Sequence, residues 1–354
     1  MSAGRERRTA RRTGRLTAVV WAILLIAIAA CTAIGPNPGP ARTSEPSTTP
    51  ASSSPAGPSG PAPVTQRRPG WALDRIDQRH LPLDQRFTAA DGGRGVTVYV
   101  VDGLFDVTNP EFGGRASVGL KLGRACDLDD GTDHGLFVAG LVGGRRTGVA
   151  KRATIVSVGS SYGCEGGTGG ATQAQVIARV VRALGWVAEH ARRPAVVNLS
   201  LNGDGPSPEL AAAVRRLTDA GLTVIASAGN DGDNACRHPP AGLPLVITVS
   251  GSTRSDTDAG LNHGRCVDLY APADGVRSVV DADLVPEGLV TSEIAATSWA
   301  APLVSGAAAL YLAAHPDASP AEVRGWLIDN ATTGALHGNL HGSPNRLLFT
   351  GGPL

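Results

Sequence analysis

The stretch 296–315 reads ATSWAAPLVSGAAALYLAAH, a long apolar and alanine-rich run that is interrupted only by Pro302 and Gly306. A segment that is apolar on every side is typical of a helix buried on all faces at the centre of a large domain. Ser298 lies at the start of this run, where a helix has unpaired backbone N–H groups and the positive end of its dipole. A hydroxyl in that place can attack a carbonyl carbon and have the resulting negative charge stabilised. An isolated serine there is more simply a helix cap, so the interpretation depends on the rest of the chain.

The first 34 residues are typical of an export signal or membrane anchor. Six arginines precede an apolar run from Leu16 to Ala30, which is the order of a secretory signal whose basic end stays in the cytoplasm. The run ends in Ile28-Ala29-Ala30-Cys31, which resembles the lipobox of bacterial lipoproteins and implies a lipid on Cys31. Two alternatives stay open: simple cleavage near Ala29, and an uncleaved anchor, because residues 16–34 are just long enough to span a bilayer. All three place the bulk of the protein outside the cytoplasm, with the membrane as a partner of this segment.

Residues 35–69 are nearly all Pro, Ser, Thr, Gly and Ala. Such a composition has too little apolar surface to offset the entropy of ordering, so we expect a flexible linker. Residues 70–350 are enough for one large α/β domain, which we expect to be monomeric. The formal net charge of the chain is +1, and no basic patch alternates with aromatic residues, so nucleic acid is not expected as a partner.

From residue 95 onward, strand-like and helix-like segments alternate along the chain. Strands are expected at 96–101, 154–158, 195–201, 222–228 and 245–250. Helices are expected at 134–144, 172–190, 207–220, 296–315 and 319–330. This alternation predicts a mainly parallel central sheet that is covered by helices on both faces. In such a sheet the chemistry lies at the carboxyl ends of the strands.

Four polar residues are expected at that edge of the sheet. Asp102 ends the first strand, His134 begins the next helix, Asn230 follows the strand at 222–228, and Ser298 begins the apolar helix. A serine hydroxyl needs a base to take its proton, a carboxylate to orient the base, and donors to stabilise the oxyanion. The four residues supply one group for each role. Their order, Asp before His before Ser, is that of subtilisin and differs from the order in α/β-hydrolases.

The sequence from Trp71 to about Ile328 resembles subtilisin-like serine proteases (peptidase family S8), in particular bacterial secreted enzymes of the proteinase K branch. Six segments carry the resemblance: WALDRIDQRHLPLD at 71–84, VVDGLFDVTNPEF at 100–112, DHGLFVAGLVGG at 133–144, VVNLSLNG at 196–203, ASAGNDGDNAC at 226–236 and ATSWAAPLVSGAAALYL at 296–312. Each segment alone is a weak signal, but together and in this order they are highly specific.

The resemblance implies a three-layer subtilisin-like fold and an exported serine endopeptidase that acts on proteins or peptides and needs no cofactor for catalysis. It implies that Asp102 orients His134, that His134 is the general base, that Ser298 is the nucleophile and that Asn230 is an oxyanion donor. The implied walls of the S1 pocket, which takes the side chain before the cleaved bond, are Ser200, Leu201 and Asn202 on one side and Ser227, Ala228 and Gly229 on the other. Gly167, Thr168 and Gly169 are implied to lie beside the substrate backbone, which would add as a strand.

The neighbours of the catalytic residues depart from the family pattern. Asp102 is followed by Gly-Leu where the family has Thr-Gly, and Ala296 replaces a glycine. Trp299 replaces a methionine, and Asn202 replaces a glycine at the edge of the S1 pocket. Because a site that is about 1 Å too loose loses on the order of a hundredfold in rate, the alternative is a catalytically weak or inactive protein of this fold that binds peptides or a partner protein.

Four cysteines, Cys126, Cys164, Cys236 and Cys266, lie in the exported domain, where disulfides persist. The residues alone leave three pairings open, and the resemblance implies the pairs Cys126–Cys164 and Cys236–Cys266. Metal ligation is the rival, although no C-x-x-C spacing supports it. The histidines of the C-terminal half, His238, His263, His337 and His341, show no ligand spacing and are expected on the surface.

A structural calcium site is a further implication of the resemblance. Asp268, with the backbone carbonyls of Pro244 and Val246, matches such a site in the proteinase K branch. Oxygen ligands of this kind suit a hard cation. An ordinary surface aspartate is the alternative interpretation of Asp268.

Overall fold

The central sheet contains nine strands among the residues that the structure, a computed structural model, describes: 63–122, 133–160 and 172–351. Its order across the sheet is β12-β13-β9-β8-β7-β6-β3-β5-β4. The bounds are β3 Thr97–Asp102, β4 Ala116–Lys121, β5 Thr154–Gly159, β6 Ala195–Leu199, β7 Thr223–Ser227, β8 Ile247–Ser252, β9 Leu269–Pro272, β12 Thr332–Thr333 and β13 Arg346–Leu347. In the order across the sheet, the seven strands β9-β8-β7-β6-β3-β5-β4 all pair in parallel with their neighbours. Strand β13 pairs in parallel with β9, and in this sheet only β12 is antiparallel to its neighbour. The predicted α/β class with a mainly parallel sheet is confirmed.

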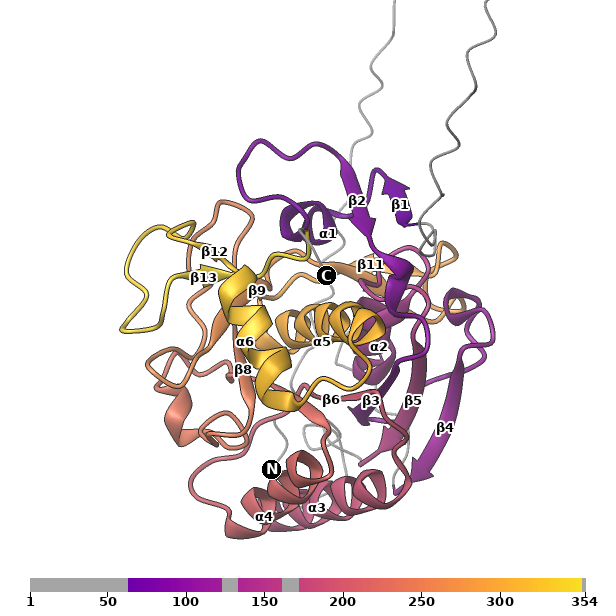
Figure 1. Ribbon diagram of the computed structural model, residues 1–354, viewed down its shortest axis with the longest axis vertical. Coiled ribbons are helices and arrows are strands. Elements are labelled where there is room, and N and C mark those ends of the chain that lie inside the picture. The colour runs from indigo at the N-terminus through magenta and orange to yellow at the C-terminus, as the bar shows by residue number, and fades with distance from the viewer. Residues whose placement is uncertain (1–62, 123–132, 161–171, 352–354) are drawn as a thin grey trace, which may run out of the picture. The chain divides into compact units, whose positions relative to one another are not determined.

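Helices cover both faces of this sheet, so the fold has three layers (Figure 1). The helices α2 (His134–Gly143), α5 (Thr297–Ala314) and α6 (Pro320–Asn330) share one hydrophobic core with one face of the sheet. The helices α3 (Gln173–His190) and α4 (Pro208–Asp219) share a second core with the opposite face. Alternate residues of one strand enter different cores: Val98 and Val100 of β3 face α5, while Tyr99 and Val101 face α3.

The central helix α5 is formed by the apolar stretch 296–315. It is long and apolar enough to cross a membrane, but 83% of that stretch is buried inside the fold, so it is the core helix of this domain. Gly306 is required where α5 crosses the loop after α2, because a Cβ there would approach the Cβ of Val149 to 2.5 Å. Pro302 removes the amide that would bond to the carbonyl of Ser298 four residues earlier, and this carbonyl therefore accepts a bond from outside the helix.

Shorter elements surround the two cores. They are β1 (Val64–Arg67), α1 (Trp71–Ile76), β2 (Arg86–Ala89), β10 (Arg277–Val279) and β11 (Leu289–Thr291). Strand β1 pairs antiparallel with β2, although its residues were assigned to the linker from composition. Regular structure therefore begins several residues before the predicted boundary at residue 70.

The strand boundaries differ from the prediction at two places that matter for the site. The strand expected at 195–201 ends at Leu199, and Ser200 and Leu201 leave the sheet toward Ser298. The strand expected at 245–250 begins at Ile247, because Pro244 and Leu245 are exposed and precede the first sheet pairing, between Ile225 and Ile247. Strands β4 and β9 were not predicted; β4 lies at the sheet edge with several exposed residues, so its sequence lacks a clear apolar run.

Candidate active site

Asp102 and His134 meet at the carboxyl edge of the parallel sheet. Asp102 is the last residue of β3 and is fully buried, and His134 is the first residue of α2. The Asp102 oxygens lie 2.8 and 3.0 Å from His134 Nδ1, and the Gly103 amide donates to Oδ1 at 2.7 Å. An ionised carboxylate only accepts hydrogen bonds, so Nδ1 is the donor and Nε2 of the neutral ring keeps its lone pair. The arrangement provides an imidazole whose outward nitrogen can take a proton.

The environment of His134 stabilises its protonated form. Burial of the ring lowers its pKa, but the charge of Asp102, the hydrogen bond to Asp102 and the charge of Asp133 act in the opposite direction and outweigh it. The pKa of His134 therefore lies above its ordinary value of 6.5. Asp133 is also the N-cap of α2, since its side chain accepts from the Leu136 amide at 3.1 Å.

Ser298 is buried in the first turn of α5, and its backbone is held by the loop after β6. The Ser298 carbonyl, which lacks a helical partner because of Pro302, accepts from Ser200 Oγ at 3.1 Å. The Ser298 hydroxyl donates to the Ser200 carbonyl at 3.4 Å. Among the described residues the Ser298 hydroxyl forms this one hydrogen bond and does not bond to His134.

A buried polar chain continues from Ser200 into the core. Asn198 Nδ2 donates to Ser200 Oγ at 3.0 Å, and Ser305 Oγ donates to Asn198 Oδ1 at 2.8 Å. These residues are all fully or almost fully buried. Because a broken bond would leave a polar group buried and unpaired, this chain fixes the start of α5 relative to β6.

Asn230 follows β7, and its orientation is fixed by Thr297. The Asn230 carbonyl oxygen accepts from both the amide and the hydroxyl of Thr297, each at 2.9 Å. The Thr297 hydroxyl oxygen in turn accepts from the Gly229 amide at 3.1 Å. The Asn230 oxygen is thus held against the start of α5, which fixes the orientation of this exposed side chain and leaves its NH₂ group as the remaining donor. Sequence analysis missed the role of Thr297, whose only signal was its place beside Ser298.

Trp299 is buried and packs against the ring of His134. Its ring centroid lies 5.3 Å from that of His134 and 4.3 Å from that of Phe137. Its indole N–H donates to the Ile294 carbonyl at 3.2 Å, which satisfies the buried polar end. The departure from the family pattern at this position therefore adds an aromatic contact to the imidazole.

Several predicted residues lie outside the described residues. They are Cys31, Cys126, Cys164, Gly167, Thr168 and Gly169. The residues predicted to form the S1 pocket are described: Ser200, Leu201 and Asn202 follow β6, and Ser227, Ala228 and Gly229 form the end of β7 and the start of its loop. Gly229 has φ +105°, and a Cβ there would lie 2.2 Å from Asn262 Nδ2, so this wall requires glycine.

Cys236 and Cys266 form a disulfide, as the resemblance implied, with Cα atoms 5.3 Å apart and a sequence separation of 30. The bridge joins the loop after β7, which carries Asn230, to the segment before β9. Closing a loop of this length reduces the entropy of the unfolded chain.

Replacing both cysteines, as Cys236→Ser/Cys266→Ser, is expected to lower the free energy of unfolding by about 3–4 kcal/mol. Urea denaturation measures this loss, and the comparison is made in a Ser298→Ala background so that self-digestion does not interfere. A loss below about 1 kcal/mol would contradict a stabilising role for the bridge.

Asp268 does not have the surroundings of a calcium ligand. Arg324 Nη2 donates to Asp268 Oδ1 at 2.5 Å, and the Thr248 amide donates to Oδ2 at 2.9 Å. Both carboxylate oxygens thus have donors, and the positive charge of the Arg324 guanidinium lies next to the carboxylate that would bind the cation. Among the described residues no group of three or more His, Cys, Asp or Glu side chains is arranged to hold a metal ion. The calcium site implied at Asp268, Pro244 and Val246 does not fit this structure.

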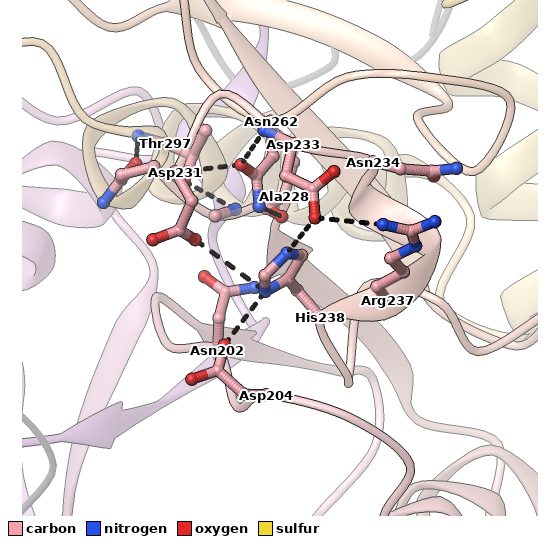
Figure 2. Close-up of polar contacts among 12 residues, drawn as sticks. Asn202, Asp204, Ala228, Asp231, Asp233, Asn234, Arg237, His238, Asn262 and Thr297 are labelled. Atoms are coloured by element: carbon pink, nitrogen blue, oxygen red, sulfur yellow. Dashed lines mark hydrogen bonds and ion pairs between the residues drawn. The ribbon is translucent and has the colours of Figure 1, made fainter.

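His238 is buried, so its expected surface position is wrong; Figure 2 shows the carboxylates around its ring. Its Nδ1 lies 3.3 Å from Asp204 Oδ1 and 3.7 Å from Asp231 Oδ2, and its Nε2 lies 3.4 Å from Asp233 Oδ2. The Asn234 amide and His238 lower the pKa of the Asp233 carboxyl. Asp204 follows β6 and the other two follow β7, so the imidazole joins these two loops.

Comparison with known proteins shows the family to which this chain belongs. The profile of the subtilase family matches residues 93–346. An extracellular serine proteinase of Thermus sp. (strain Rt41A) is 40% identical over 282 residues, which cover 79% of this chain and 66% of that protein. Alkaline serine exoprotease A of Vibrio alginolyticus is 38% identical over 282 residues, which cover 79% of this chain and 50% of that protein.

A solved structure is similar over most of the domain. The crystal structure of a cold adapted subtilisin-like serine proteinase shares 37% sequence identity and a TM-score of 0.69, covering 80% of this chain and 98% of that chain. The chain spans slightly less than two thirds of the Thermus relative and half of the Vibrio relative. The profile match and the shared fold show that this chain belongs to the subtilase family.

Proposed function

We propose that this chain is an exported serine endopeptidase that cleaves peptide bonds of protein or peptide substrates through an acyl-enzyme. The observation that carries the proposal is the buried contact between Asp102 and His134, at the sheet edge where α5 presents Ser298. The relatives in Thermus and Vibrio are named proteases, which supports the reaction class.

The proposed reaction begins when His134 Nε2 takes the proton of the Ser298 hydroxyl. The Ser298 oxygen bonds to the substrate carbonyl carbon, and the oxyanion that forms accepts hydrogen bonds from Asn230 and from the backbone amide of Ser298 in the first turn of α5. The C–N bond then breaks as His134 returns the proton to the leaving amine. His134 next takes a proton from water, whose oxygen attacks the carbonyl carbon of the Ser298 ester. The ester bond breaks, His134 returns the proton to the Ser298 oxygen, and the acid product leaves. Asp102 holds the ring and stabilises its charged form throughout.

The proposed first step needs a rotation of the Ser298 side chain. The hydroxyl bonds to the Ser200 carbonyl at 3.4 Å and must turn toward His134. Hydrogen bonds of catalytic groups are often long before substrate binds and tighten in the complex. The same observation favours the second candidate function, a weak or inactive peptide-binding protein, and a hydrolysis assay separates the two.

An internally quenched peptide that is blocked at both ends tests the proposal. An endopeptidase cleaves it inside the sequence, and treatment with a fluorophosphonate abolishes the cleavage. Absence of cleavage across a set of such peptides, or cleavage that the fluorophosphonate leaves intact, would contradict the proposal. If only peptides with a free end are cleaved, the proposed activity changes from endopeptidase to exopeptidase.

The pKa of His134 predicts the pH dependence of the reaction. Only the neutral ring accepts a proton, so kcat/KM is expected to rise with pH through a midpoint above 6.5. Asp133→Asn removes one of the charges that raise this pKa and keeps a good N-cap, so the midpoint is expected to move to lower pH.

The pH profile of kcat/KM measures this shift, with Asp219→Asn as the matched control. Asp219 is exposed at the end of α4, on the opposite face of the sheet. A shift to higher pH in Asp133→Asn, or an equal shift in both variants, would contradict the effect of the Asp133 charge.

We further propose that the N-terminal segment exports the domain and attaches it to the membrane through a lipid on Cys31. The name of the Thermus relative, an extracellular proteinase, supports export. Cys31→Ala is expected to leave the precursor uncleaved if Cys31 is lipidated, and immunoblotting of membrane and medium fractions detects the change in size. Unchanged size and membrane association would favour an uncleaved anchor, and release of the domain into the medium would favour simple cleavage.

The proposal includes no cofactor in the catalytic step. It also includes no calcium ion at Asp268, because Arg324 and the Thr248 amide already bind that carboxylate.

A further inference from the structure

The two loops next to Ser298 determine which side chain fits beside the cleaved bond. The last pair between strands β6 and β7 joins Leu199 to Ala226. Beyond this pair, the chain that follows each strand contacts the start of α5. Ser200 bonds to Ser298, and the Gly229 amide bonds to Thr297. The resemblance to subtilisin-like proteases implies that the substrate residue whose carbonyl is attacked by Ser298 places its side chain against 200–202 and 227–229, and these contacts are consistent with that placement.

We propose that Asn202 narrows this pocket and restricts the residue before the cleaved bond, P1, to small side chains such as Gly, Ala and Ser. The inference rests on the proposed endopeptidase function and names its substrate class. Asn202 projects from one wall and forms two hydrogen bonds to the other: its Nδ2 donates to the Ser227 carbonyl at 2.8 Å, and its Oδ1 accepts from Ser227 Oγ at 2.9 Å. The amide therefore spans the space between the walls.

The bridge lies beside Gly229 of the second wall, close enough that a side chain on this residue would touch it. The Asn202 Cγ lies 3.6 Å from the place that a Cβ on Gly229 would take, which is ordinary van der Waals distance. The Ser227 hydroxyl lies 3.5 and 3.4 Å from the carbonyls of Leu199 and Leu201. Both groups that hold the amide of Asn202 are thus fixed by the ends of the two strands.

Further contacts prevent the loop after β6 from moving aside. The Gly203 amide donates to the Pro239 carbonyl at 2.7 Å, and the Gly205 amide donates to the Arg237 carbonyl at 3.1 Å. Between them, His238 lies against both Asp204 and Asp231 (Figure 2). Widening the pocket by a shift of this loop would break these contacts together, so the width is set by the Asn202 side chain.

A large P1 side chain must displace the Asn202 amide, whereas a small one need not. Displacement breaks both bonds to Ser227 and leaves its buried carbonyl without that donor, and unpaired buried polar groups discriminate strongly between substrates. We expect kcat/KM for P1 Phe to be lower than for P1 Ala by on the order of 10–100-fold. The exposed carboxylates Asp204 and Asp231 suggest a competing preference for P1 Lys, which the experiment includes.

The test uses blocked tetrapeptide p-nitroanilides that differ only in P1, which is Ala, Phe or Lys. Wild type is expected to prefer Ala. Asn202→Gly removes the bridge, so the ratio of kcat/KM for Phe to that for Ala is expected to rise by on the order of 10–100-fold. Ser227→Ala removes one of the two bonds and is expected to raise the ratio less. Asn339→Gly, at an exposed asparagine elsewhere, is the control and is expected to leave the ratio unchanged.

A wild-type preference for Phe or Lys, or an unchanged ratio in Asn202→Gly, would overturn the inference. If circular dichroism shows that Asn202→Gly is unfolded, the wild-type profile and Ser227→Ala decide the question. Labelling with a small fluorophosphonate that has no P1 side chain distinguishes a wrong role for Asn202 from failure of the proposed function. Labelling of wild type with the wrong P1 profile refutes the role of Asn202 alone, and no labelling refutes the nucleophile and the inference with it.

Discussion

Ser298→Ala is expected to lower kcat/KM for a peptide substrate by on the order of 10⁴–10⁶, the range set by subtilisin itself. In the proposed mechanism the hydroxyl forms the covalent bond to substrate, so its loss removes the acyl-enzyme route. Donors at the start of α5 and Asn230 would still bind the developing charge, which leaves a small residual rate above that of water. Because Ser298, His134 and Asp102 act as one unit, adding His134→Ala to Ser298→Ala is expected to cost little more.

Steady-state kinetics on the quenched peptide measures this loss, and urea denaturation checks that the fold is kept. Ser255→Ala, at an exposed serine far along the chain, is the matched control and is expected to stay within about twofold of wild type. Activity of Ser298→Ala within about tenfold of wild type, in a preparation free of other proteases, would contradict the assignment of the nucleophile.

Asn230→Ala is expected to lower kcat by on the order of 10²–10³ with a smaller effect on KM, the magnitude established for the corresponding donor in subtilisin. Thr297 holds the Asn230 oxygen from two sides at 2.9 Å, so the NH₂ group is already oriented before substrate arrives. A donor that acts on the oxyanion binds the transition state more strongly than the substrate, and its loss therefore appears in kcat.

The variant Asn230→Asp tests the same donor without a change in shape. It replaces the NH₂ group by an oxygen, and its expected loss in kcat is at least as large as that of Asn230→Ala. A loss confined to KM in both variants would contradict an oxyanion role and would assign Asn230 to substrate binding alone.

The sequence predicted the fold and the meeting of Asp102 with His134 because both follow from local patterns. Apolar runs that alternate with amphipathic segments indicate a parallel sheet, and polar residues at the carboxyl ends of its strands must share one edge. The position of Ser298 followed in the same way from the apolar run of α5.

Contacts between distant residues could not be predicted in this way. Asp268 and Arg324 are far apart in sequence, and only the fold brings the guanidinium to the carboxylate that resembled a calcium ligand. The three carboxylates around the buried His238 come from two loops, and no spacing along the chain reveals that they meet at this ring.

The structure also gave meaning to departures that the sequence left open. Asn202 and Trp299 were visible only as replacements of a glycine and a methionine. Asn202 bonds to Ser227, and Trp299 packs on His134. Both contacts depend on side-chain conformation, which hydrophobic patterns do not encode. The interruption at Pro302 was visible in the sequence, but its consequence, a Ser298 carbonyl that bonds to Ser200, required the helix to be placed against β6.

The central claim is that Ser298 is a nucleophile activated by His134. Mass mapping of the native protein after brief treatment with a fluorophosphonate tests it most directly. We expect one adduct per chain, on the peptide that contains Ser298, with labelling lost in His134→Ala and after unfolding of the wild type. An adduct on another residue, or native wild type that stays unlabelled while a known subtilase in the same tube reacts, would contradict it.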